Sequence, residues 1–163
     1  MRARIICTIL FLLLLSSCAG QSEPTPLPAD TEIFLQRGPC FGGCPVYSVT
    51  IQADGTVIYQ GTRFVEQTGE VRSSISQADL QRLVEAFDEA RFFKFKDRYN
   101  EPRGFTCREF RTDAPSVITS ITIDGTSKQV NHYTGCIGFS REDKLIALED
   151  LIDEVVNTEQ WIK

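Results

Sequence analysis

The chain has 163 residues, of which 42% are hydrophobic and 24% are charged, as in an ordinary single globular domain. Its formal net charge is −5, from 17 basic and 22 acidic side chains. Phosphate and anionic lipid attract clustered Lys and Arg, so this balance argues against a nucleic-acid partner and against electrostatic binding to a membrane surface.

The first 17 residues have the pattern of a secretory signal peptide. Arg2 and Arg4 supply positive charge, and an eleven-residue apolar run, interrupted only by Cys7 and Thr8, follows at residues 5–15. This run is too short to span a bilayer, which takes about 20 residues, and it fits the hydrophobic region of a signal peptide.

Leu15-Ser16-Ser17-Cys18 resembles the bacterial lipobox, in which the cysteine is acylated and the chain is cut just before it. The alternative is plain cleavage after a small residue, which would leave Cys18 as a free thiol. An exposed unpaired thiol is a liability in an exported protein, so acylation of Cys18 is favoured. Two or three acyl chains hold a membrane stably, so we expect the lipid bilayer to be a partner of this protein.

Residues 18–30 are predicted to be a lipidated cysteine followed by a proline-rich linker. Cleavage would remove two arginines and no acid, leaving 15 basic and 22 acidic residues and a net charge of −7. Fully extended, residues 19–30 reach about 40 Å. Ala19 stands where inner-membrane lipoproteins of enteric-type bacteria carry aspartate, which favours the outer membrane, facing the periplasm, if the cell is Gram-negative.

A single folded domain is predicted over residues 31–163, beginning with a strand at 31–37. The stretch 37–47, here called the cysteine corner, follows and has the sequence Arg-Gly-Pro-Cys-Phe-Gly-Gly-Cys-Pro-Val-Tyr. Two-residue alternation then predicts a strand from Val46 to Ile51, and Asp54-Gly55 predicts a hairpin turn. A three-residue loop would place Ile51 opposite Val57 and Val49 opposite Tyr59, because apolar side chains then meet on one face.

The middle of the chain predicts two further strand segments, at 64–65 and 71–75, and then a helix. Ser76-Gln77-Ala78-Asp79 is typical of a capped helix start, and an apolar stripe at i, i+3, i+4 and i+7 extends the helix to about Ala90. The aromatic cluster at 92–95 is interpreted as core or a short strand. Residues 97–115 lack periodicity, and Cys107 in their middle indicates a covalent attachment.

The last third predicts a second hairpin, with strands at 117–123 and 128–133 around Asp124-Gly125; its register stays open. Ser140-Arg141-Glu142-Asp143 repeats the helix-start pattern, and an apolar stripe leads to about Asn157. Trp161 is expected to pack back onto the domain. The predicted class is α+β: an antiparallel meander sheet of about five to seven short strands, with two Asp-Gly hairpins and two amphipathic helices on one face.

Four cysteines remain once Cys7 leaves with the signal peptide and Cys18 takes lipid. An even number in an exported chain indicates two disulfides, for which three pairings exist. The preferred pairs are Cys40 with Cys44 and Cys107 with Cys136, because the Gly42-Gly43 turn lets the first two meet.

Two other interpretations of the cysteines stay open. Cys40, Cys44, His132 and Cys136 have the ligand types of a zinc or copper(I) site. Cys-x3-Cys-Pro also resembles the motif of copper chaperones for respiratory oxidases, where it lies between a strand and a helix of a thioredoxin-like fold. Here Pro45 leads into a strand, and the helix N-terminus that lowers thiol pKa in redox motifs is not predicted.

The sequence contains no recognised catalytic or phosphate-binding motif, and it indicates no cofactor. His132 is the only histidine, and a surface or structural role is expected for it. A binding or scaffolding domain is therefore favoured over an enzyme.

Three stretches together resemble a bacterial domain family of unknown function whose members are often exported lipoproteins. They are Arg-x-x-Cys-Phe-Gly-x-Cys-Pro-x-Tyr at 37–47, Asp54-Gly55, and Asn-His-Tyr-x-Gly-Cys at 131–136. The resemblance implies export and a shared fold over residues 31–163, and it supplies no activity. We expect a cell-envelope lipoprotein that binds or scaffolds an envelope protein or ligand; the alternative is a thiol-disulfide or copper-handling protein using Cys40 and Cys44.

Overall fold

The computed structural model describes residues 26–101 and 106–163. Along the chain the elements are β1 Glu32–Arg37, β2 Val46–Gln52, β3 Thr56–Arg63, β4 Gly69–Ser74, α1 Gln77–Glu89, η1 Phe92–Lys94, β5 Arg98–Tyr99, β6 Glu109–Phe110, β7 Ser116–Ile123, β8 Thr126–Tyr133, β9 Cys136–Ile137, α2 Glu142–Val156 and α3 Glu159–Ile162. The predicted signal peptide and Cys18 lie outside the described residues. Within those residues, no helix is long and apolar enough to cross a membrane.

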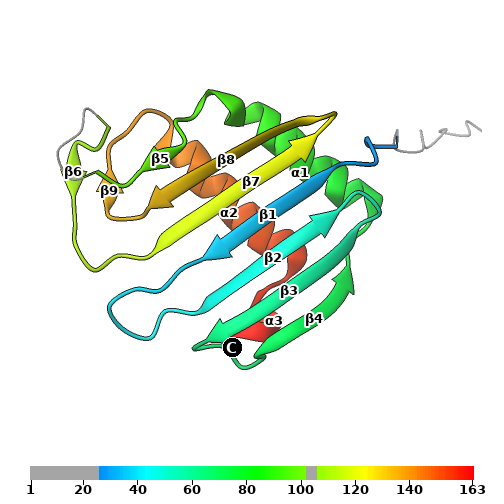
Figure 1. Ribbon diagram of the computed structural model, residues 1–163, viewed down its shortest axis with the longest axis horizontal. Coiled ribbons are helices and arrows are strands. Elements are labelled where there is room, and N and C mark those ends of the chain that lie inside the picture. The colour runs from blue at the N-terminus through cyan, green and yellow to red at the C-terminus, as the bar shows by residue number, and fades with distance from the viewer. Residues whose placement is uncertain (1–25, 102–105) are drawn as a thin grey trace, which may run out of the picture.

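One seven-stranded sheet forms the body of the domain, in the order β4-β3-β2-β1-β7-β8-β5. The helices all lie on one of its faces, behind the sheet in Figure 1. The α+β class and the two-layer arrangement are confirmed. The sheet differs from a simple meander in that β1 is central, between β2 and β7, and the two-residue β5 runs parallel to β8.

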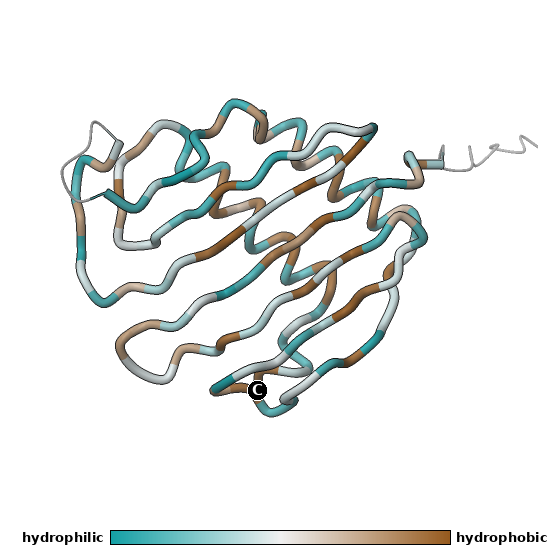
Figure 2. The backbone as a smooth tube through the Cα atoms, viewed as in Figure 1, coloured by the Kyte–Doolittle hydropathy of each residue, from teal (hydrophilic) through white to brown (hydrophobic). Residues whose placement is uncertain are grey.

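The register of the first hairpin is as predicted from apolar matching. Val49 lies opposite Tyr59 and Ile51 opposite Val57, and these four side chains are almost completely buried. Gly55 has the positive φ, 84°, that the three-residue loop requires. The two-residue alternation follows the strands in Figure 2, and burial alternates in the same way along β1, β3 and β7, where the buried side chains face the helices. Phe34, Ile58 and Ile118 fall at the other positions of the alternation and are only half-buried.

The second hairpin has a two-residue turn that fixes the register left open by the sequence. Asp124 and Gly125 have φ values of 49° and 70°, as a type I′ turn requires at both central positions. Ile123 therefore pairs with Thr126, and Thr119 with Val130.

The first helix begins as predicted, and the second does not. Ser76 Oγ accepts a hydrogen bond from Asp79 N at 3.0 Å and caps α1. At α2 the N-cap is Arg141, in left-handed conformation, and no side chain caps the helix. The predicted cap at Ser140 is wrong, because α2 begins only at Glu142. The chain turns at Arg141, whose side chain donates hydrogen bonds of 3.2 Å to the carbonyl oxygens of Ala90 and Arg91.

The aromatic cluster at 92–95 joins the core as a short 3-10 helix, with Phe92 and Phe95 buried. Phe92 contacts Phe87 of α1 edge-on, with ring centroids 4.8 Å apart. The C-terminus folds back as predicted, and Trp161 packs on Tyr59 with a centroid separation of 4.6 Å.

The end of the predicted linker is attached to the domain. Leu27 packs against the core, and the Asp30 carboxylate accepts hydrogen bonds from the backbone nitrogens of Asp124 and Gly125 at 3.1 and 2.6 Å. The linker therefore contacts the domain at the β7–β8 turn. This turn lies at the same end of the sheet as the beginning of β1 (Figure 1).

A disulfide joins Cys107 to Cys136 with a Cα separation of 5.1 Å, so the predicted covalent attachment of this segment is present. Next to it, β6 pairs with β9, and the Phe110 and Tyr133 rings stack with centroids 5.0 Å apart. Cys136 itself is fully buried. This bond therefore connects the poorly patterned segment after β5 to β9, which follows β8.

We predict that replacing Cys107 and Cys136 with serine lowers the free energy of unfolding by about 3.6 kcal/mol, because the bond closes a long loop in the unfolded chain. The matched replacement of Cys40 and Cys44 should cost about 2 kcal/mol. Urea denaturation of the two double mutants measures both values. A larger loss for the Cys40/Cys44 mutant would contradict the loop-entropy explanation.

Candidate functional site

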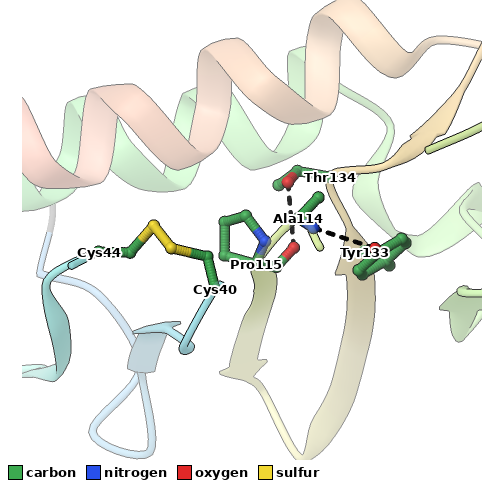
Figure 3. The surroundings of a disulfide bond; sticks show 6 residues. All are labelled: Cys40, Cys44, Ala114, Pro115, Tyr133 and Thr134. Atoms are coloured by element: carbon green, nitrogen blue, oxygen red, sulfur yellow. Dashed lines mark hydrogen bonds between the residues drawn. A yellow bond between two sulfur atoms is a disulfide. The ribbon is translucent and has the colours of Figure 1, made fainter. Parts of the chain in front are cut away.

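The cysteine corner connects β1 to β2 and is closed by a disulfide between Cys40 and Cys44, the expected pair. Pro115, just before β7, lies beside this disulfide in Figure 3. A recess of about 240 Å³ separates the bond from α3. Its lining includes Cys44, Pro45, Pro115, Val117 and Ile162. The recess is mostly apolar and has the size of one large side chain.

Two backbone hydrogen bonds attach the corner to the segment that leads into β7. Gly38 N donates to Ser116 O at 2.8 Å, and Phe41 N donates to Asp113 O at 3.2 Å. A Cβ atom on Gly38 would lie 2.9 Å from Ser116 O, so a larger residue would push the two segments apart. The corner is therefore held at both its entry and its middle.

Two large aromatic side chains remain in solvent at this end of the sheet, and we call them the aromatic tip. Phe41, within the disulfide loop, is 88% exposed, and Phe64, directly after β3, is 56% exposed. The two loops lie close together, since a Cβ atom placed on Gly43 would be 3.9 Å from Cδ1 of the Phe64 ring. The Arg63 guanidinium lies 5.8 Å from the centroid of the Phe64 ring, within the range of a cation–π contact.

Behind the corner, Arg37 binds three carboxylates of α2. Its Nε and Nη2 atoms lie 2.9 and 2.8 Å from Asp153 Oδ2, and Nη2 donates to Asp150 Oδ1 at 3.0 Å. Arg37 Nη1 is 4.0 Å from Glu149 Oε2. Because Arg37 is the last residue of β1, this group of contacts fixes the start of the corner against the helix layer.

Asp153 also accepts hydrogen bonds from two hydroxyls. Tyr47 OH donates to Asp153 Oδ1 at 2.7 Å, and Thr158 Oγ1 donates to the same atom at 3.0 Å. Burial and the neighbouring Asp153 charge raise the pKa of Tyr47 above its ordinary value of 10.0, so this phenol stays protonated. For Arg37, burial lowers the pKa, but Asp153 and Glu149 more than offset it and the pKa rises.

His132 lies at the inner end of the same network. It and Glu149 are each 1% exposed, and His132 Nδ1 is 3.2 Å from both Glu149 carboxylate oxygens. The His132 ring also contacts Phe139 edge-on at 5.4 Å. His132 thus has a structural position, connecting β8 to α2 beneath the sheet.

The alternative ligand set Cys40, Cys44, His132 and Cys136 is not assembled. The two disulfides engage all three sulfur atoms of this set, and His132 Nδ1 faces Glu149. In the described parts of the chain, no three His, Cys, Asp or Glu side chains are grouped as metal ligands. Pro45 is followed by β2 and not by the N-terminus of a helix.

The sequence pattern of the domain of unknown function DUF6438 matches residues 31–156. The chain belongs to the DUF6438 family. The DUF6438 match runs from just before β1 to the end of α2, so it contains both disulfides, the aromatic tip and the Arg37 contacts, and it leaves α3 outside. No curated protein matches the sequence.

The α2 carboxylates were not predicted as part of a site. A signal was present, because Glu149 falls in the apolar stripe of α2, four residues after Leu145 and three before Ile152. A charged side chain on the buried face of a helix requires a partner. The sequence did not show that Arg37 and His132, on separate strands, would supply it.

We predict that Arg37→Met lowers the free energy of unfolding by about 3 kcal/mol, because it leaves the buried Glu149 and the half-buried Asp153 without their cation. Arg72→Met is the matched control. Arg72 pairs with Glu70 on the exposed β4, so its loss should change stability by about 0.5 kcal/mol or less. Equal urea midpoints for the two variants would contradict a structural role for the Arg37 contacts.

Proposed function

We propose that this DUF6438 protein is a lipid-anchored protein of the bacterial cell envelope whose domain binds another envelope component without catalysis. Acylated Cys18 would provide the attachment to the bilayer, and the outer membrane, facing the periplasm, is the proposed site in a Gram-negative cell. Two disulfides support an oxidising compartment outside the cytosol.

The observation that carries the binding function is the placement of linker and aromatic tip at opposite ends of the sheet. Asp30 contacts the turn next to the beginning of β1, and the cysteine corner begins where β1 ends. Figure 1 shows these two ends on opposite sides of the domain. A six-residue strand is about 20 Å long, so a chain anchored through its linker can present the corner well away from the attachment point.

The buried polar groups support binding rather than chemistry. Arg37 and Tyr47 both bind Asp153, and Glu149 binds His132. These contacts fix the corner against α2. The groups that the site exposes to solvent are the Phe41 and Phe64 rings and the backbone of the corner, and such groups suit contact with another surface.

Thiol-disulfide or copper handling by Cys40 and Cys44 is the second candidate. One observation favours it: both residues are only half-buried, so the bond is accessible from solvent. Copper binding requires that Cys40 and Cys44 be reduced, and thiol-disulfide exchange requires that the bond open and close, whereas the binding function keeps them as a disulfide.

We predict that Cys18→Ser abolishes incorporation of labelled palmitate and the mass increase of the N-terminal peptide, since Cys18 is the proposed acylated residue. Cys7→Ser is the matched control, because Cys7 lies in the predicted signal peptide, and it should label like the unaltered chain. Palmitate labelling that persists in Cys18→Ser would overturn the proposed anchoring. So would an unaltered chain that is not labelled.

A further inference from the structure

We propose that Phe41 and Phe64 together form a docking site for a partner protein, whose surface provides apolar pockets for the two rings. The inference rests on the proposed binding function and specifies the residues and the class of partner. The two side chains lie on separate loops, β1–β2 and β3–β4, that the fold brings together at one end of the sheet.

The exposure of these rings has no explanation within the domain. Folding buries most other large apolar side chains of the described residues, yet Phe41 is 88% and Phe64 56% exposed. Aromatic residues, Phe among them, are enriched at the centres of protein interfaces, because they bury much area at small entropic cost. Two such residues are 23 positions apart in sequence, and their loops approach each other at Gly43 and Phe64, so both can belong to one interface.

The Phe41 loop is fixed before any partner binds. The Cys40–Cys44 disulfide closes it, and the hydrogen bond from Phe41 N to Asp113 O holds its tip. A loop held in this way loses little backbone freedom on binding, which raises affinity.

Phe64 adopts a backbone conformation that its side chain disfavours. Its φ of 55° is left-handed, a region that is unusual for a bulky residue and that glycine adopts freely. Such strain persists where the surrounding structure holds it, and it is concentrated at functional sites. Phenylalanine at this position therefore indicates a role for the ring itself, which the conformation directs beside the Phe41 loop.

A protein partner fits these features better than a lipid surface. A fluid bilayer needs no fixed spacing between inserted rings, whereas protein pockets do. The charges around the aromatic tip are of both signs. Arg63 and Glu66 flank Phe64 in the sequence. Asp113 accepts a hydrogen bond from Phe41 N through its backbone carbonyl, so its carboxylate also belongs to this region. Binding to anionic lipid draws on clustered basic residues, which this acidic chain does not concentrate here.

The test is photo-crosslinking in intact cells, with p-benzoylphenylalanine in place of Phe41 or of Phe64 in the full-length chain. The matched control position is Phe93 of η1, which is 44% exposed and belongs to a different part of the fold. We expect the same protein adduct from positions 41 and 64 and none from position 93. Phe64→Ser should reduce the adduct from position 41 about tenfold or more, the effect of losing one buried aromatic ring.

Four results would overturn the inference: no protein adduct from either position, an adduct with the mass of two copies of this chain, an equal adduct from position 93, or no effect of Phe64→Ser. Flotation of the purified protein with phosphatidylethanolamine–phosphatidylglycerol vesicles that is lost in Phe41→Ser would overturn it in favour of lipid. Phe41→Ser and Phe64→Ser should keep the unfolding midpoint of the unaltered protein, because both side chains are exposed.

Palmitate labelling of the same cells separates this inference from the proposed anchoring. A labelled chain that gives no adduct would overturn the docking site and leave the lipid anchor standing. An unlabelled chain that gives the expected adduct would overturn the anchor alone.

Discussion

The contacts between Arg37 and the carboxylates of α2 are the interaction on which the arrangement of this domain depends. Arg37 ends the central strand, and its guanidinium lies 2.8 Å from Asp153 and 4.0 Å from Glu149. Apolar packing holds the sheet to the helices without directional bonds, whereas a guanidinium with several hydrogen bonds adds a directional constraint at one position. The interaction also reaches His132 through Glu149, so it connects β1, β8 and α2 at one place.

The same interaction relates the interior of the domain to its proposed binding surface. The corner leaves β1 at Arg37 and re-enters the sheet before Tyr47, whose hydroxyl also binds Asp153. Both ends of the eleven-residue corner are thus attached to one carboxylate of α2, and the Cys40–Cys44 bond shortens the loop between them. The polar network and the disulfide therefore act together on the position of Phe41.

Local patterns predicted most of the fold, and what they left open or missed depends on turn type, strand order and long-range polar contacts. Matching Val49 with Tyr59 needed only neighbouring residues, and the register was correct. The β7–β8 register followed from a type I′ turn that Asp124-Gly125 permits but does not require. Arg37 and Asp153 are separated by 116 positions, and no periodicity links them. The cap at Ser140 failed because Arg141 forms tertiary contacts with the end of α1, which outweighed a local preference.

The central claim is that the fold holds the two exposed rings in a fixed arrangement, and backbone relaxation of the oxidised protein tests it most directly. The account predicts amide order parameters near 0.85 for Phe41 and Phe64, the value of rigid backbone. It also predicts that reduction of the Cys40–Cys44 bond lowers the value for Phe41. Order parameters below about 0.6 for both residues in the oxidised protein would contradict the account, because a flexible loop cannot present the rings at a fixed spacing.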